Sequence, residues 1–410
     1  MDFSVFVLPA ALVVGAYMAW SIGANDVANA MGTSVGSGAL TLRQAVLIAA
    51  VFEFIGAFFV GTHVTDTVRG RILEAGPFLQ QPEALIRGMF SALLGAAIWL
   101  HVASYFGWPV STTHSIVGAI IGFGLLSGFE TIQYPVLGKI VASWFISPSL
   151  GAAISFGMFS FIRRKILTAE DARRALQKIG RYLVGLVFCI LTLAVIYKGL
   201  KNLKLDLPIW QALGIALVSG VVLGAWVDRI IQTKLVASPD QLAHVEGVFG
   251  YLQILTAAYV AFAHGANDVA NAIGPLAVVV AGVKGAIVSL KVPVPLWLLA
   301  MGGLAIVVGL ATFGYRVMAT IGKKITDITP SRGFSAEFGT ATTVLLFSKL
   351  GLPISTTHTL VGAVIGVGVA GGMSALNLRM VWTILKSWVA TIPIAASLTI
   401  VIDLLLRVFV

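Results

Sequence analysis

Long runs of apolar residues recur along the chain, separated by short stretches that hold most of its charged residues. Each run is continuous and can supply most of a membrane-crossing helix, which needs about 20 residues with weakly polar flanks. The pattern therefore predicts an all-α protein that crosses a membrane many times, with roughly 10–12 segments. The clearest runs are Ala45–Val60, Met89–Val102, Leu183–Ile196, Ile209–Val227 and Leu296–Leu310.

Composition strengthens this prediction. Hydrophobic residues make up 58% of the chain and charged residues only 11%, whereas a soluble domain carries about 25% charged residues. The N-terminus has no basic region before its first apolar run, so we expect a retained span rather than a cleaved signal peptide. The single cysteine, Cys189, excludes an intrachain disulfide and is typical of a small apolar position.

Two polar segments each occur twice in this apolar background. Gly23–Ala30 and Gly265–Ala272 share the same eight residues, Gly-Ala-Asn-Asp-Val-Ala-Asn-Ala. Pro109–His114 and Pro353–His358 share the pattern Pro-x-Ser-Thr-Thr-His at nearly the same separation. The chain is therefore a duplication.

The duplication predicts three parts. Repeat 1 covers residues 1–160, a less similar middle section with the basic loop and two linking spans covers 161–240, and repeat 2 covers 241–410. Polar groups placed twice at membrane depth predict two inverted-topology repeats that build one site at their interface.

Both segments contain residue types that interrupt membrane helices. Asparagine and aspartate favour caps and turns over helix interiors, so we expect a broken helix at Gly23–Ala30 and at its copy. In the other segment, proline ends one element and the Ser-Thr-Thr run caps a new, re-entrant helix. Its free N–H groups and hydroxyls would suit a tetrahedral oxyanion. The predicted hydroxyl ligands are Ser111, Thr112, Thr113, Ser355, Thr356 and Thr357.

The charges of these segments do not balance. Two aspartates and one phosphate bring at least three negative charges, while two helix N-termini return only about one positive charge in total. None of the four segments contains lysine or arginine. Because an acid inside a membrane needs a cation or a proton, we expect cations to enter with the anion, or the aspartates to be protonated. The predicted cation ligands are Asp26, Asn29, Asp268 and Asn271, with sodium at the two aspartates.

Two further acids lie in apolar surroundings. Glu53 lies within an apolar helical run, and Glu337 lies in a segment that does not align with it in the repeat. Glutamates embedded in a membrane usually face the protein interior. We therefore expect each at a cation site or gate, with a structural polar contact as the alternative.

Three histidines accompany the segments. His114 and His358 stand at predicted helix starts, and two roles stay open for them: structural hydrogen bonding, or a site or proton role. His264 precedes the second Asn-Asp segment, but its counterpart is Ile22, so we do not expect it to share in the site.

The net charge of +10 comes from residues between the apolar runs. The densest stretch covers residues 163–181, which we expect to be a cytoplasmic loop of a cell inner-membrane protein, with a short surface helix over Ala169–Lys178. Contact with anionic lipid headgroups explains this charge without a nucleic-acid partner.

The doubled motifs resemble the inorganic phosphate transporter (PiT) family over nearly the whole chain. The resemblance implies an inverted-repeat helical fold, sodium- or proton-coupled phosphate transport and a homodimer. It also implies a core site with phosphate at Asn25 and Asn267 beside the two aspartates, and Glu53 and Glu337 match acidic positions that matter for transport. The short basic stretch resembles prokaryotic members, and close relatives carry sulfate.

The leading interpretation is thus a secondary carrier that imports phosphate with sodium, without a cofactor or enzymatic activity. A proton-coupled carrier of phosphate, metal-phosphate or sulfate is the alternative in the same class. An anion channel would favour a cationic lining and avoid paired acids. A membrane phosphatase or transferase would need a nucleophile beside an evident base, which the hydroxyl clusters do not offer.

Overall fold

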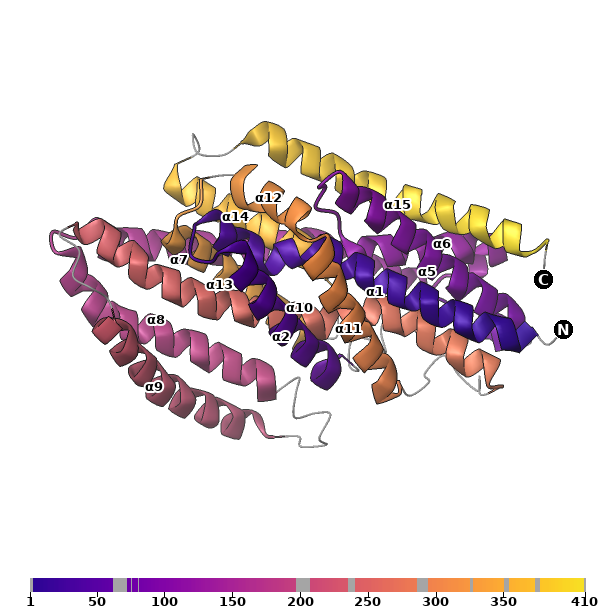
Figure 1. Cartoon of the computed structure of the whole chain (residues 1–410), viewed down its shortest axis with the longest axis horizontal. Helices are drawn as coiled ribbons and strands as arrows, with labels where there is room; N and C mark the ends of the chain where they lie inside the picture. Colours follow the sequence, from indigo (N-terminus) through magenta and orange to yellow (C-terminus); the bar gives the residue numbers. More distant parts are fainter. Residues whose placement is uncertain are drawn as a thin grey trace.

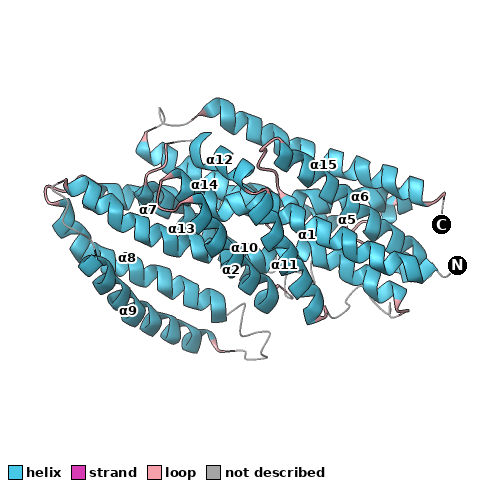
Figure 2. Ribbon diagram, in the orientation of Figure 1, coloured by secondary structure: helices cyan, strands magenta, loops and turns pink. Residues whose placement is uncertain are grey.

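The computed structural model describes residues 3–61, 72–74, 76–79, 81–196, 207–234, 240–285, 294–324, 327–349, 354–372 and 377–408. In this part the chain is almost entirely helical (Figures 1 and 2), with one isolated bridge between Leu73 and Ile132. The helices are α1 (Phe3–Gly36), α2 (Leu42–Val60), α4 (Gly76–Leu79), α5 (Pro82–Tyr105), α6 (Thr112–Ser127), α7 (Tyr134–Ile162), α8 (Ala172–Ala194), α9 (Ile209–Lys234), α10 (Gln241–Val283), α11 (Leu296–Thr312), α12 (Tyr315–Lys324), α13 (Pro330–Lys349), α14 (Thr356–Gly371) and α15 (Leu378–Leu406).

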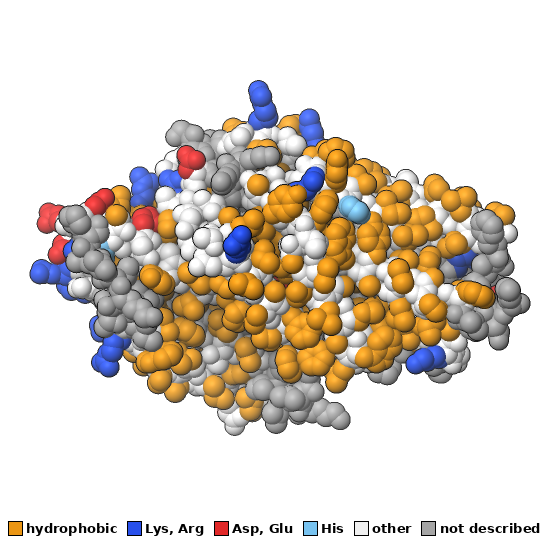
Figure 3. All heavy atoms as spheres, viewed as in Figure 1, with side chains coloured by type: hydrophobic (Ala, Val, Ile, Leu, Met, Phe, Trp, Pro, Cys, Tyr) orange, Lys and Arg blue, Asp and Glu red, His pale blue; other side chains and the backbone are white. Residues whose placement is uncertain are grey.

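The apolar runs form the predicted membrane helices. Eight described helices are long and apolar enough to cross a membrane, namely α1, α2, α5, α7, α8, α9, α10 and α15, and three shorter apolar helices are α6, α11 and α14. Among the described residues, the eight candidate spans are fewer than the 10–12 predicted segments, and the three shorter apolar helices are not counted among them. Figure 3 shows hydrophobic side chains over the middle of one face and charged side chains gathered at its left end. The prediction of an all-α, multi-pass membrane protein is confirmed.

Corresponding helices of the two halves run in opposite directions. In Figure 1, α1 runs inward from the N-terminus, and α10, which carries the second Asn-Asp segment, runs the opposite way. The starts of α6 and α14 contact each other. The Thr113 hydroxyl donates to the carbonyl of Ile354 at 3.2 Å, and the Thr357 hydroxyl donates to the carbonyl of Val110 at 3.3 Å. The inverted repeat stays a prediction, which the opposite directions of α1 and α10 support.

Each half packs its re-entrant helix against a helix of the other half. A side chain at Gly118 in α6 would meet the backbone of Ile392 in α15, and a side chain at Gly362 in α14 would meet the backbone of Pro148 in α7. Glycine therefore allows each re-entrant helix to lie against the last helix of the other half. The site is held by both halves rather than by either one.

The middle section contributes an antiparallel pair, α8 and α9, at one side of the bundle (Figure 1). The basic stretch is mostly helical rather than a loop, because a π-helical turn over Arg163–Leu167 extends α7 and α8 begins at Ala172. The predicted separate surface helix is wrong. Residues 172–178 instead form the first turns of α8, since Leu176 and Leu183 continue one buried stripe at helical spacing.

The predicted helix breaks at the Asn-Asp segments are also wrong, because α1 and α10 continue through both of them. The glycine of each segment serves close packing instead of a turn. A Cβ at Gly23 would collide with the carbonyl of Ile306, and a Cβ at Gly265 would collide with the carbonyl of Glu53. The asparagine and aspartate side chains bond to neighbouring elements and leave the helical backbone intact.

We predict that Gly23→Ala and Gly265→Ala destabilise the protein by about 1–3 kcal/mol each, because the added methyl forces two backbones apart. Gly157→Ala in α7 is the matched control, since its Cβ would meet nothing within 4 Å and helix propensity alone favours alanine by about 0.5–1 kcal/mol. Thermal unfolding of detergent-purified protein, followed by tryptophan fluorescence, measures the difference. Equal melting temperatures for all three variants would show that close approach is no constraint here.

Candidate functional site

The Asn-Asp segments of α1 and α10 meet the first turns of α6 and α14 at the centre of the molecule. Each predicted site residue is buried, and none is more than 3% exposed. The site is therefore closed to solvent in this conformation.

The two aspartates have equivalent partners. Thr112, the first residue of α6, donates its hydroxyl to Asp26 at 2.8 Å. Thr356, the first residue of α14, donates its hydroxyl to Asp268 at 3.0 Å. In each half the acid thus accepts a hydrogen bond from the start of that half's own re-entrant helix.

The second asparagine of each segment connects the halves. The amide of Asn29 donates to the Thr357 hydroxyl at 2.8 Å. The amide of Asn271 lies 3.3 Å from the hydroxyls of both Thr112 and Thr113. The structure therefore brings both amides, both acids and the threonines of both halves into one polar cluster.

Ser111 and Ser355 form the predicted N-caps. Each hydroxyl accepts the backbone N–H three residues later, that of His114 and that of His358, at 3.1 Å in both cases. The partial positive charges of both helix starts therefore face the acidic cluster.

The first asparagines of the segments have different surroundings. The amide nitrogen of Asn25 donates to the Ser104 hydroxyl at 3.1 Å and to the Trp108 carbonyl at 3.0 Å. Its carbonyl accepts the backbone N–H of Val110 at 3.3 Å, so Asn25 holds the connection between α5 and α6. Asn267 instead donates to the neighbouring Asp268 at 2.9 Å.

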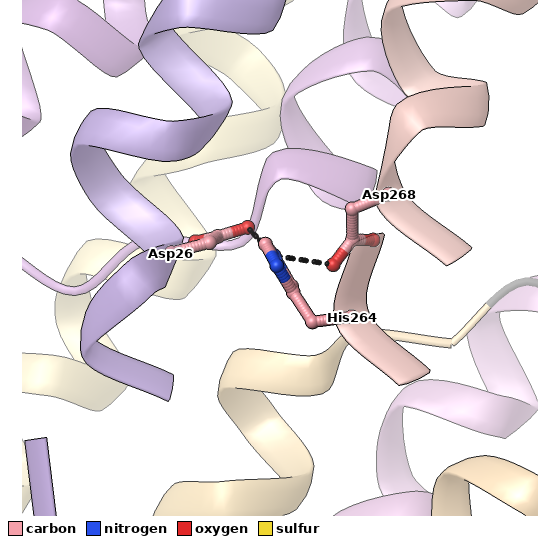
Figure 4. A group of neighbouring side chains, drawn as sticks. All are labelled: Asp26, His264 and Asp268. Carbon is pink, nitrogen blue, oxygen red and sulfur yellow. Dashed lines mark ion pairs between the residues drawn. The ribbon is translucent and has the colours of Figure 1, made fainter. Parts of the chain in front are cut away.

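His264 lies between the two aspartates, as Figure 4 shows. Its Nε2 is 2.9 Å from a carboxylate oxygen of Asp268 and 3.6 Å from one of Asp26. The expectation that His264 lies outside the site is wrong. It rested on the repeat alignment, in which the counterpart of His264 is the apolar residue Ile22. The available signal was its spacing of four residues from Asp268, which places both on one face of α10.

Glu53 joins the cluster through the same histidine, because His264 Nδ1 is 3.3 Å from its carboxylate. Glu53 is fully buried, and the paired glycine contacts place it where the other half has Ile306. Glu53 with His264 therefore corresponds to Ile306 with Ile22. This polar pair makes a two-fold arrangement asymmetric.

Glu337 lies in a separate buried cluster and accepts only neutral donors among the described residues. They are hydroxyls of α1 and α10 and one amide of α10: Thr33 at 2.6 Å, Ser34 at 2.7 Å, Thr256 at 2.5 Å and Gln253 at 3.1 Å. These donors were missed from the sequence, although Gln253 and Thr256 stand three residues apart in an apolar run. In the described part, no lysine or arginine forms an ion pair with this acid.

His114 and His358 face each other, with ring centroids 4.1 Å apart. Trp144 lies 3.8 Å from the first ring, and Trp388 stacks on the second at 3.5 Å. These contacts between equivalent residues give the histidines an aromatic packing role that neither sequence alternative specified.

The cluster can bind a cation and an anion side by side. Asp26, His264 and Asp268 each offer a ligand atom, and these atoms lie within 4.8 Å of one another. Threonine hydroxyls and two helix starts face the same cluster and suit an oxyanion. A buried cluster of acids and hydroxyls between duplicated helical halves is typical of membrane carriers.

Comparison with known proteins identifies the carrier class further. Residues 22–399 match the Phosphate transporter family, and the chain belongs to that family, so it is a phosphate transporter. A relative from Pyrococcus abyssi is 46% identical, covering 95% of this chain and 96% of the relative. Inorganic phosphate transporter 2-1, chloroplastic, from Arabidopsis thaliana is 47% identical, covering 96% of this chain and 71% of its own length.

A solved structure of a sodium-dependent phosphate transporter is also similar. It superposes with a TM-score of 0.91 at 40% identity and covers 98% of this chain and all of its own.

We predict that His264→Ile destabilises the protein by about 3–5 kcal/mol, because it leaves three buried acids without their shared partner. The double variant Glu53→Ile, His264→Ile reproduces the equivalent apolar pair of Ile306 and Ile22 and should be more stable than His264→Ile alone. Thermal unfolding without sodium or phosphate measures both, with His244→Ile on the same helix as the control. A double variant no more stable than His264→Ile would contradict the coupling of Glu53 with His264.

Proposed function

We propose that this protein imports inorganic phosphate together with sodium ions, through the buried cluster at the interface of its halves. The observation that carries the proposal is the pairing of two aspartates with two hydroxyl-lined helix starts and one imidazole, without an ion pair to lysine or arginine in the described part. This site has oxygen ligands for a cation and hydrogen-bond donors for an anion.

Phosphate is bound by Thr112, Thr113, Thr356 and Thr357 and by the starts of α6 and α14. Ser111 and Ser355 fix those helix starts as caps, Asn25 holds the adjoining connection, and Asn267 completes the set. Backbone N–H groups at a helix start bind phosphate well because the helix dipole adds to their hydrogen bonds.

Sodium is bound by Asp26 and Asp268 with the amide oxygens of Asn29 and Asn271, since oxygen ligands suit a hard cation. Glu53 and Glu337 supply two further acidic positions. Sodium binding and phosphate binding are coupled because the aspartates and phosphate compete for the same hydroxyl donors. Without a cation, Thr112 and Thr356 donate their hydroxyls to the aspartates. A cation on each carboxylate releases these hydroxyls to donate to phosphate.

The same site supports a second candidate, proton coupling. His264 lies against Asp26, Asp268 and Glu53, where an imidazolium would provide the positive charge that sodium otherwise supplies. This candidate extends to metal-phosphate, and sulfate has the same tetrahedral shape as phosphate.

The relative with the solved structure is a sodium-dependent phosphate transporter, which supports sodium as the first candidate. A homodimer, an inner-membrane location and a cytoplasmic position for residues 163–181 stay predictions.

A gradient assay separates the two candidates. We predict that labelled phosphate uptake into proteoliposomes is at least about tenfold faster with an inward sodium gradient than with a matched potassium gradient, because each uncompensated buried charge costs more than 1.4 kcal/mol. An excess of sulfate in the same assay measures whether the site also takes that oxyanion, because competition would slow phosphate uptake. Equal uptake in sodium and potassium would reject sodium coupling, and stimulation by an inward proton gradient alone would establish the second candidate.

We predict that Asp26→Asn and Asp268→Asn each reduce sodium-dependent uptake by about tenfold or more, because the amide of similar size lacks the charge that holds the cation. Folding should be affected less, which thermal unfolding of the same preparations checks. Asp171→Asn is the matched control, since Asp171 is an exposed N-cap of α8 and asparagine caps equally well. Full sodium dependence in both site variants would refute the assigned role.

A further inference from the structure

A cavity of about 420 Å³ lies between the end of α7 and the end of α14. Helix α14 spans 16 residues from the central site to this cavity, which is about 24 Å. The lining combines two arginines, two hydroxyl residues and three apolar residues: Arg163, Arg164, Ser160, Thr168, Phe156, Val369 and Ala370.

The cavity has a surplus of positive charge. Arg163 donates to the carbonyl of Ala370 at 2.8 Å, where it satisfies the last turn of α14 and complements the negative end of the helix dipole. Among the described residues, no carboxylate forms an ion pair with Arg163 or Arg164. Two neighbouring guanidinium groups without an acid favour a phosphate group as their partner.

The rest of the lining distinguishes a lipid from a free ion. Phe156 and Val369 are 45% and 42% exposed beside the arginines. Inorganic phosphate would use only the polar end of the cavity, whereas a phospholipid would use both ends. The exposed apolar side chains would contact its acyl chain while the guanidinium groups bind its headgroup.

We propose that this cavity binds an anionic phospholipid, with its phosphate on Arg163 and Arg164 and its acyl chain against Phe156 and Val369. The bound headgroup holds Arg163 at the C-terminal end of α14. The opposite end of α14 donates the Thr356 hydroxyl to Asp268. Anionic lipid therefore stabilises the helix that forms half of the phosphate site, independently of which cation drives transport.

Lipid binding tests the proposal without requiring transport. Purified protein is mixed with phosphatidylglycerol or phosphatidylcholine, and bound lipid is counted by native mass spectrometry. The wild type should retain phosphatidylglycerol in preference to phosphatidylcholine, and Arg164→Gln should weaken that retention about tenfold, the loss expected for one charge-assisted contact. Arg174→Gln is the matched control, because Arg174 belongs to the same basic stretch but pairs with Asp171 outside the cavity.

Three outcomes would overturn the proposal. Arg164→Gln could retain the lipid as the wild type does. Arg174→Gln could lose it equally, which would indicate general attraction to the basic stretch. Millimolar inorganic phosphate could displace the lipid from the wild type, which would assign the cavity to the free ion.

Uptake supplies a second readout. Phosphate uptake by the wild type should be several-fold faster in vesicles with one-third phosphatidylglycerol than in pure phosphatidylcholine, and Arg164→Gln should lose that difference while Arg174→Gln keeps it. Equal uptake by the wild type in both vesicles would reject the stabilising effect on α14. Absence of uptake in every vesicle would count against the proposed function and leave the binding result intact.

Discussion

The rest of the structure depends on one electrostatic constraint, the burial of carboxylates at the centre of a membrane protein. Asp26, Asp268 and Glu53 are fully buried, and an isolated charge in such surroundings costs several kcal/mol or more. The fold surrounds the two aspartates with the start of α6, the start of α14 and threonine hydroxyls, and the imidazole of His264 lies beside all three acids. Helix starts supply only part of the missing positive charge, so the cluster is suited to bind a mobile cation.

The same constraint explains why the halves interlock. Asn29 of one half bonds to Thr357 of the other, and Asn271 bonds back to Thr112. Each re-entrant helix also lies against the last helix of the opposite half.

The duplicated halves surround the aspartates with equivalent helices, but the ionisable side chains around them are not symmetric. The pair of Glu53 from the first half and His264 from the second corresponds to the apolar pair of Ile306 from the second half and Ile22 from the first. Glu337 lies in its own cluster of neutral donors. Thr112 and Thr356 thus hold equivalent positions against the two aspartates, whereas Glu53 and Glu337 break the two-fold pattern.

The sequence by itself determined the class of fold, the duplication and most of the central cluster, because apolar run length, exact repeats and uncompensated acids are local signals. The serine caps at Ser111 and Ser355 also followed from residue type. Only the tertiary structure decided that α1 and α10 stay unbroken. Gly23 does not mark a turn: it is needed because the backbone of Ile306, a residue far away in sequence, packs directly against it. It also placed His264 between the aspartates. The counterpart of His264 in the other repeat is apolar, so the repeat comparison gives no signal, and its role appears only when α1 with Asp26 lies beside α10.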